Sequence, residues 1–310
     1  MIATVALAAL AAFAAERVLR RSCPDVSNGR WGPWRLPWPR ALALPLEWLT
    51  RSRFVHLHFE RAPLFAMHSD IEDVVYVNYL IDAERAARLV PEGLELQRLG
   101  PRGDRALFTH LTYRHGHFGP RFLPALLRWL LPSPIQSNWR IHVRDPHTGL
   151  AGIEFIDNVV GSAAVAVAAR VTSEGVSMHV PRAAHLTRSP DGAIDLLIDP
   201  GTGSAMDVRA ALRPSEWQLP PAWREVFPDP LAFLTYCVPQ DRALSAEPWL
   251  EQDSRQEINL GITPDRCEPL AGEVVSEAAR RIAGDVPTVC FRVARVDFLL
   301  AGTAHDRWRR

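Results

Sequence analysis

Apolar and polar residues alternate through most of the chain after about residue 70, and this pattern predicts a body made mainly of strands. The alternation is clear in VVYVNYLI (74–81), in RALFTHLTY (105–113) and along the whole of TVCFRVARVDFLL (288–300). A repeat of two residues places successive side chains on opposite faces of a sheet. The segment 185–199 adds a predicted hairpin, because its Asp-Gly pair at 191–192 favours a tight turn.

Short helices are predicted between these strands. Asp82 is a suitable N-cap for a helix that ends before Pro91, and the segment 230–238 begins with a proline, which suits a first helical turn. The apolar run 123–131 predicts another helix, ended by the prolines that follow it. The alanine-rich stretch 161–171 fits either a helix or a strand. Antiparallel strands with a few short helices indicate the α+β class.

The stretch SNWRIHVRDPHTGLAGIEFID (137–157) predicts one long hairpin. Odd-numbered positions are apolar in both of its strands: Trp139, Ile141, Val143, Ala151, Ile153 and Phe155. A five-residue loop over 145–149 places Ile141 opposite Ile153, and it places Arg140 opposite Glu154 on the other face. A four-residue loop would set Ile141 against Glu154. The pattern therefore favours the five-residue loop.

Length and composition are those of an ordinary globular protein. The 310 residues are 47% hydrophobic, which is enough for one large domain or two closely joined lobes. The 35 basic residues balance 35 acidic ones, so net charge does not favour nucleic acid as a partner. We expect an N-terminal extension over 1–69, a folded body over 70–302 and a solvated basic tail over 303–310.

The N-terminal extension is open to two interpretations. Residues 1–15 predict an apolar helix, which falls short of the ~20 residues of a membrane-spanning one, and the arginines that follow favour a cytoplasmic location. Tryptophans alternate with Arg and Pro over 30–50, which predicts an irregular, extended segment. Residues 1–50 either contact a membrane peripherally, or their tryptophans cover an apolar flank of the body.

Every basic residue is an arginine, so no side chain of this sequence can form a Schiff base. Arg140 and Glu154, as a facing pair, are candidates for a pocket floor that binds a carboxylate or a ketone oxygen. The alternative is an ion pair on a solvated face. His142 shares a face with Arg140 and is a candidate for proton exchange or, alternatively, an ordinary surface or core residue. His110 completes the set of candidate substrate-binding residues.

The sequence predicts no metal site and no cofactor. Two His-x-His pairs, at 56–58 and 115–117, would each place both imidazoles on one face of a strand. A metal would need a further ligand such as His110 or Glu60, and no coupled motif supplies one, so a solvated loop is the alternative for the second pair. The four cysteines are far apart and are expected to be small buried apolar residues. The glycines of 201–205 are expected to form a turn, since the rest of a phosphate-binding loop is missing.

Four stretches carry a resemblance to a known family: VNYLIDAERAARLVPEGLEL (77–96), the hairpin 137–157, DPLAFLTYCV (229–238) and the final strand ending in RVDFLL (295–300). They resemble, in order, the YqjF-like family of uncharacterised bacterial proteins, within the acetoacetate-decarboxylase-like superfamily. The resemblance covers about residues 70 to 300 and leaves 1–69 out.

The resemblance implies a mostly antiparallel, closed or partly closed β-barrel or cone with short flanking helices and an enclosed cavity. Acetoacetate decarboxylase itself uses a lysine pair, so the absence of lysine means that its imine chemistry cannot be carried over. Two functional hypotheses follow. In the first, the cavity binds a small organic acid or ketone, with or without acid/base catalysis. In the second, the chain is a non-enzymatic membrane-surface or partner-binding protein, targeted by its N-terminal apolar and Trp/Arg segments.

Overall fold

The computed structural model describes residues 32–52, 54–56, 66–173, 175–238, 241–247 and 252–307, with a few isolated positions before residue 30. The expected apolar helix over 1–15 lies, apart from isolated positions, outside the described residues, and so does His58 of the first His-x-His pair. Every helix in the described part of the chain is too short or too polar to cross a bilayer.

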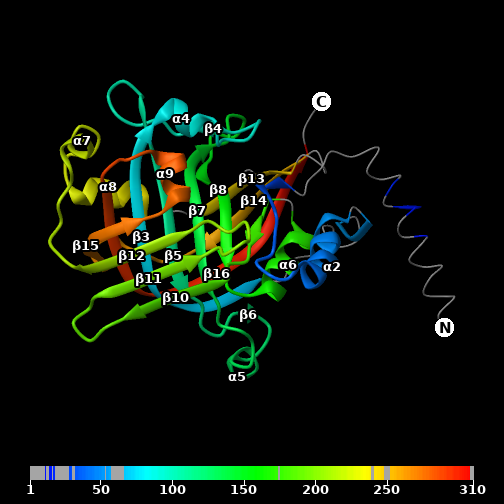
Figure 1. Ribbon diagram of the computed structural model, residues 1–310. Coiled ribbons are helices and arrows are strands. Elements are labelled where there is room, and N and C mark those ends of the chain that lie inside the picture. The colour runs from blue at the N-terminus through cyan, green and yellow to red at the C-terminus, as the bar shows by residue number, and fades with distance from the viewer. Residues whose placement is uncertain are drawn as a thin grey trace.

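The described elements follow one another along the chain as shown in Figure 1. In order they are β1 (Asn28–Gly29), β2 (Gly32–Pro33), α2 (Arg40–Arg51), β3 (Met67–Asp82), α4 (Ala83–Ala87), β4 (Glu95–Leu96), β5 (Arg105–Arg114), β6 (Gly119–Pro120), α5 (Ala125–Arg128), β7 (Ile135–Arg144), β8 (Ala151–Val160), α6 (Ala163–Thr172), β9 (Met178–His179), β10 (Ala183–Arg188), β11 (Ile194–Asp199), β12 (Val208–Pro214), α7 (Pro221–Arg224), α8 (Pro230–Cys237), β13 (Arg242–Glu247), β14 (Gln252–Asn259), the 3-10 turn η1 (Pro264–Arg266), β15 (Cys267–Val275), α9 (Glu277–Ala283) and β16 (Thr288–Arg307).

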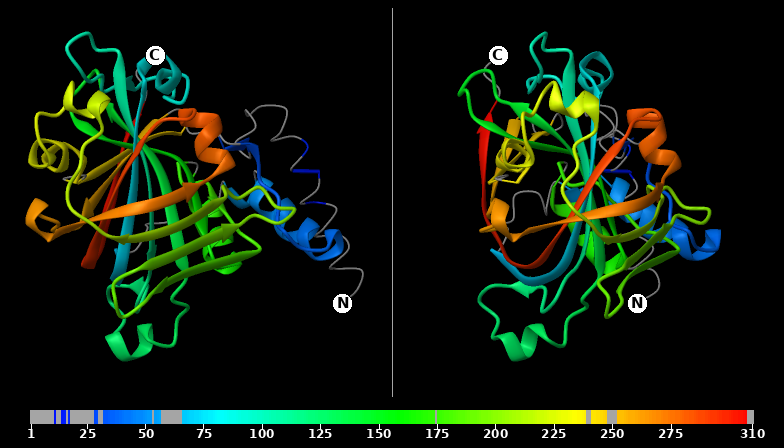
Figure 2. Two further views of the ribbon diagram at one scale, coloured as in Figure 1. Left: turned by 60° about the vertical axis from the view of Figure 1, so that its left-hand side comes forward. Right: turned by 90° about the vertical axis from the view of Figure 1, so that its left-hand side faces the viewer.

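Long strands pair in a ring. The order is β3, β5, β7, β8, β13, β14 and β16, and β16 returns to pair with β3. All neighbours in this ring are antiparallel except β8 and β13, which meet in parallel at the pair Ile153 and Ala243. Figures 1 and 2 show the strands curving around a common interior. The predicted fold class, a mostly antiparallel sheet with short helices, is confirmed.

The ring closes because β16 is 20 residues long and has partners on both edges. One edge pairs with β3 from Thr288 to Leu300. The other edge pairs first with β15 and then, from Leu299 to Arg307, with β14. Residues 303–307 of the expected tail are not an irregular end, because they form the last part of β16 and pair with β14.

Two apolar cores lie on the two faces of the ring strands. The outer faces of β3, β5, β7 and β8 pack against β10, β11, β12 and α9, which cross outside the ring. On the inner face, side chains of α7 and α8, including Trp223 and Phe233, pack with residues of β3, β5 and β16 such as Tyr76 and Phe291. The central strands are thus buried on both faces.

Local signals placed most helices correctly. Asp82 caps α4 by accepting a hydrogen bond from the backbone N–H of Arg85 at 3.0 Å. Ser162 caps α6 in the same way, which settles the stretch 161–171 as a helix. The helix predicted over 123–131 is shorter, since α5 spans only Ala125–Arg128. Cys237, Cys267 and Cys290 are buried, as predicted.

The extended conformation expected over 30–50 is wrong for residues 40–51, which form α2 with Pro45 inside the helix. An internal proline costs about 3 kcal/mol, so packing must offset it. Glu47 supplies part of that packing: its carboxylate accepts a hydrogen bond from Leu36 N at 3.1 Å and pairs with Arg40 at 3.1 Å. Trp34 is fully buried against α6. This side chain therefore covers an apolar flank of the body, which is the second of the two interpretations of the N-terminal extension.

The register of the central hairpin corrects the prediction from residue parity. Arg140 pairs with Phe155 and Ile141 pairs with Glu154, so the expected facing pair of Arg140 and Glu154 is wrong. Ile141 and Ile153 consequently lie on opposite faces of the ribbon. The loop has four residues, 146–149, closed by a hydrogen bond from Asp145 N to Leu150 O at 2.9 Å.

Turn chemistry outweighs the apolar alternation here for two physical reasons. The Asp145 carboxylate accepts hydrogen bonds from the backbone N–H of His147 and from the hydroxyl of Thr148, and Gly149 takes the left-handed conformation at φ 71°. Both faces of β7 and β8 are buried, so apolar residues gain by facing either way. A bulge at Ile156 then restores the register, because Trp139 pairs with Asp157.

Replacing Gly149 by Ala should lower the free energy of unfolding by about 1 to 2 kcal/mol, because a non-glycine residue is strained in the left-handed region. No other atom lies within 4 Å of the added Cβ, so backbone strain is the sole cost. Urea unfolding measures the change. The control is Gly161→Ala, whose Cβ meets ordinary contacts and whose φ is not positive; equal losses in both variants would contradict the proposed role of the turn.

His110 should make the fold sensitive to acid. Its side chain stacks on Trp139 at 4.5 Å between ring centroids, and burial lowers its pKa to about 3. Below about pH 6.5 the histidine binds a proton in the unfolded chain but not in the folded one. The free energy of unfolding therefore falls by up to about 1.4 kcal/mol for each pH unit of acidification. His110→Phe keeps a stacking ring and should lose this contribution.

Unfolding free energies of the wild type and His110→Phe, measured from pH 8 to pH 4.5, test this expectation. The comparison at pH 8 isolates the difference in packing, because the histidine is neutral in both states there. Parallel pH profiles for the two proteins would show that His110 is not the acid-sensitive group.

Candidate functional site

A cavity of about 720 Å³ lies inside the ring, beyond the end filled by α7 and α8. The inner faces of β3, β5, β7, β8, β14 and β16 form its wall, with α6 and the residues around β6 and α5 at its other end. Most of the lining side chains are apolar. The polar or charged ones among the described residues are Tyr76, Tyr113, His115, Gln136, Asn138, Arg140, Asn158, Thr172, Ser173 and Gln256.

Arg140 is the charged residue of this lining, and it is only 2% exposed. Its Nη2 donates a long hydrogen bond of 3.4 Å to the carbonyl of Cys237, the last residue of α8. The guanidinium carbon lies 5.5 Å from the centre of the Tyr76 ring. Among the described residues no carboxylate forms an ion pair with Arg140, and its Nε has no hydrogen-bond partner. A buried cation of this kind is stabilised when an anion binds beside it.

Two tyrosines on the same inner face keep their protons. Burial raises the pKa of Tyr76 to about 12, although the charge of Arg140 opposes the shift. Burial likewise raises the pKa of Tyr113 well above its usual value. The Tyr113 oxygen accepts a hydrogen bond from Asn138 Nδ2 at 3.1 Å, which leaves its own proton for a ligand. Both phenols are therefore neutral donors at physiological pH.

A chain of hydrogen bonds occupies the wall between Arg140 and the cavity mouth. Gln136 Nε2 donates to Asn138 Oδ1 at 2.7 Å, and Gln136 Oε1 lies 2.9 Å from His115 Nε2. His115 Nδ1 lies 2.8 Å from the hydroxyl of Ser69. Burial lowers the pKa of His115 to about 4, so the imidazole is neutral near pH 7. These groups satisfy one another.

The structure does not gather the four predicted site residues into one cluster. Arg140 lines the cavity, and His142 lies on the same face of β7 but stacks on Tyr236 outside the lining, with ring centroids 4.6 Å apart. Burial, and then the charge of Arg140, lowers the pKa of His142. Glu154 and His110 are buried on the opposite face, opposite Ile141 and Trp139 respectively.

Sequence reasoning missed the tyrosines and the amides of the lining. The sequence did contain a signal for the amides. Gln136 and Asn138 lie at every second position before Arg140 along β7, so they share its face of the strand. Tyr113 pairs with Gln136 across β5 and β7, and Tyr76 pairs with Leu111 across β3 and β5. Their convergence depends on which strands pair and in which register, and residue parity does not reveal either.

His115 and His117 of the second His-x-His pair do not share one face of a strand, as a metal site built on this pair would need. His115 is buried in the wall, whereas His117, at φ 51°, leaves the strand geometry and pairs with Asp70 at 2.7 Å. A different group could hold a cation: one ligand atom each from His68, Asp70 and Asp297 lies within 4.8 Å of the others. Two of these residues are exposed, and Arg128 contacts the His68 ring.

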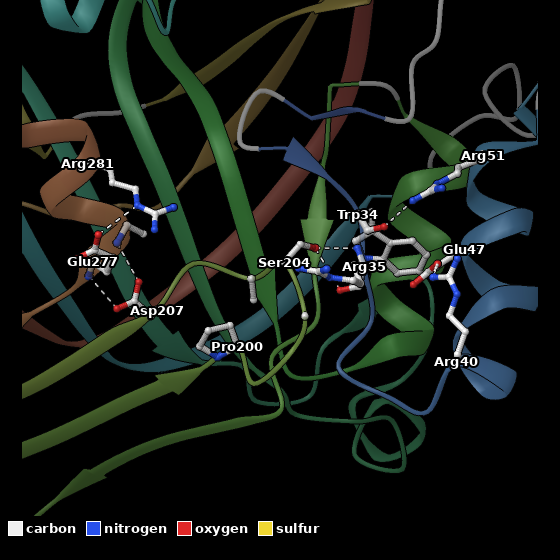
Figure 3. A pocket seen from close by; sticks show the side chains of 13 residues that line it. Trp34, Arg35, Arg40, Glu47, Arg51, Pro200, Ser204, Asp207, Glu277 and Arg281 are labelled. Atoms are coloured by element: carbon white, nitrogen blue, oxygen red, sulfur yellow. Dashed lines mark hydrogen bonds and ion pairs between the residues drawn. The ribbon is translucent and has the colours of Figure 1, made fainter.

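Another cavity, of about 910 Å³, lies between α2, the loop after β11 and the start of α9. Figure 3 shows the partners of its acidic side chains. Glu47 pairs with Arg40, Glu277 pairs with Arg281 at 3.2 Å, and Asp207 caps α9 by accepting from the backbone N–H of Glu277. Arg51 is only partly buried and donates to the Trp34 carbonyl at 2.7 Å, and Arg35 is exposed, so the described lining of this cavity contains no cation buried as deeply as Arg140.

Comparison with known proteins identifies the fold. No family model and no curated protein matches the chain. Among solved structures, the enduracididine biosynthesis enzyme MppR with HEPES buffer bound aligns with a TM-score of 0.52 and 15% identity, over 77% of this chain and 87% of that one. MppR complexed with pyruvate aligns over 77% and 90%, again with a TM-score of 0.52 and 15% identity.

Acetoacetate decarboxylase from Legionella pneumophila is similar to the same degree. It aligns with a TM-score of 0.52 and 11% identity, over 79% of this chain and 89% of that one. An acetoacetate decarboxylase-like enzyme from Sphingomonas wittichii aligns with a TM-score of 0.51 and 10% identity, over 79% and 94%. Membership of the YqjF-like family stays a prediction, whereas the likeness shows that the chain has the acetoacetate decarboxylase-like fold.

Proposed function

We propose that the chain binds a small organic acid inside the ring, with the ligand carboxylate on Arg140. The observation that carries this proposal is a buried guanidinium without a carboxylate partner among the described residues, in a mainly apolar cavity. A charge transferred from water to such a site is costly unless it is compensated. An anionic ligand supplies the compensation that the described residues do not.

The neighbouring groups suit a carboxylate. The planar guanidinium can donate two parallel hydrogen bonds to it, and the neutral phenols of Tyr76 and Tyr113 can donate further ones. A ketone oxygen next to the carboxylate would suit the Tyr113 proton. MppR, which has this fold, has been solved with pyruvate, a 2-oxo acid, and this supports the same ligand class here.

The site favours binding over turnover. The described lining contains no Asp, Glu or Lys, and His115 is already hydrogen-bonded on both nitrogens. His142, Glu154 and His110 do not line the cavity, so none of them can act directly as a general base on a ligand there. The absence of lysine from the sequence removes the imine route. We therefore assign the cavity a ligand-binding role, in which the Tyr113 hydroxyl donates a hydrogen bond to the ligand.

Replacing Arg140 by Gln should weaken carboxylate binding by roughly 10- to 150-fold, since a hydrogen bond to a charged group contributes about 1.5 to 3 kcal/mol. Isothermal titration calorimetry with butyrate and 2-oxobutyrate measures the loss. Arg144→Gln is the matched control, because Arg144 is exposed at the end of the same strand. Equal binding by the wild type and Arg140→Gln would end the proposal.

The same arginine should lower the stability of the ligand-free protein. Arg140→Met replaces a buried cation with an apolar chain of similar length, and we expect it to raise the free energy of unfolding by about 1 kcal/mol or more. Arg144→Met should stay within about 0.5 kcal/mol of the wild type, because its side chain is exposed. Urea unfolding without ligand measures both; a clear loss of stability in Arg140→Met would indicate a structural role for the arginine instead.

A further inference from the structure

The cavity is much longer and more apolar than a small acid needs. Its volume of about 720 Å³ is within the range of sites that enclose drug-sized ligands. Apolar side chains on β8 and β16 form much of the wall: Ile153, Phe155, Val296, Phe298 and Leu300. A ligand the size of acetate or pyruvate would leave most of this apolar surface uncovered.

The polar groups of the wall next to Arg140 are already hydrogen-bonded within the protein. Gln136 and Asn138 are bonded to each other and to His115 and Tyr113. A wall whose polar atoms are already hydrogen-bonded can face an aliphatic chain without leaving a buried donor or acceptor unpaired. The charge of Arg140 and the phenols next to it are then the charged end of a mainly apolar channel, whose wall also carries the side chains of Asn158 and Gln256.

The channel has a direction. At one end Arg140 contacts α8 through the Cys237 carbonyl, and the aromatic side chains of α7 and α8 fill the space beyond. From Arg140 the wall runs along β7 to Gln136, a distance of about 13 Å at 3.3 Å per residue. It continues to Met67, Pro120 and Leu131, at the end of the ring near α5. Figure 1 shows α4 and α5 at opposite ends of the long strands.

The surroundings of that far end are apolar too. Side chains of the segment around α5 are largely exposed: Phe122, Leu126, Trp129 and Leu130. An aliphatic chain that enters or protrudes there keeps contact with apolar surface along its whole path, and contact with apolar surface is what stabilises it.

We propose that the ligand is an amphiphilic carboxylic acid with an unbranched aliphatic chain. This inference rests on the proposed binding of a carboxylate by Arg140 and adds the class of the acid. The carboxylate lies on Arg140 between Tyr76 and Tyr113, and the chain extends along β8 and β16 towards Met67 and Leu131. The ligand class is thus a medium- or long-chain fatty acid.

A series of straight-chain acids from acetate to dodecanoate, titrated by calorimetry below their micelle-forming concentrations, tests the proposal. Each added methylene buried in the cavity should tighten binding about four-fold, as about 0.8 kcal/mol per methylene corresponds to that factor. Alkanols of matched length should bind the wild type more weakly than the acids. Arg140→Gln should remove most of that difference.

The outcomes separate the two levels of the argument. If acids bind but chain length has no effect, the fatty-acid inference is overturned and carboxylate binding on Arg140 stands. If no acid binds, or if Arg140→Gln binds acids as the wild type does, the proposed function itself fails and takes the inference with it.

Two tryptophan variants test the path of the chain. Met67 lines the cavity at the end near α5, whereas Leu231 is exposed on α8 and does not line it. Met67→Trp should weaken dodecanoate binding at least ten-fold and butyrate binding much less, while Leu231→Trp should leave dodecanoate binding unchanged. Equal weakening of butyrate and dodecanoate binding in Met67→Trp, or no weakening of either, would overturn the proposed path. Circular dichroism of both variants shows whether they are folded.

Discussion

The pairing of β16 with β3 on one edge and with β14 on the other is the constraint on which the rest of the structure depends. This pairing turns a row of strands into a ring and so creates an inside. Inner-face residues lose contact with bulk water, and outer-face residues are covered by β10, β11 and β12. Polar side chains on either face must then find partners within the protein or in a ligand.

Most of them find partners within the protein, and Arg140 is an exception that lies in the cavity. Gln136, Asn138 and His115 form a connected chain of hydrogen bonds along the inner wall. Arg140, two positions further along β7, has one long bond to the Cys237 carbonyl and a tyrosine ring beside it. The guanidinium is held in place by α8 and yet not neutralised by the described residues. This combination suits a site that is formed before its ligand arrives.

Local signals along the chain were enough for many elements and for the fold class. Asp82 and Asp229 cap the helices that follow them, and the Asp-Gly turn at 191–192 joins two strands as predicted. The resemblance of four stretches to a known family pointed to the superfamily whose fold the solved structures share. The local prediction of an extended segment failed at α2, where tertiary packing determines the conformation. The helix forms despite Pro45 because it packs against Trp34 and α6.

The sequence by itself determined the alternating strands, the arginine at position 140 and the absence of any lysine. The tertiary structure alone decided which residues meet that arginine. The alternation of apolar and polar residues could not predict the face of the sheet on which Glu154 lies. Both faces of its strand are buried, so neither is marked as the solvent side, and the turn at Asp145 shifts the register by one residue. Tyr76 and Tyr113 come to the site through the pairing of β3 with β5 and of β5 with β7, which joins segments that other residues separate along the chain, so no local pattern of residues can encode their meeting.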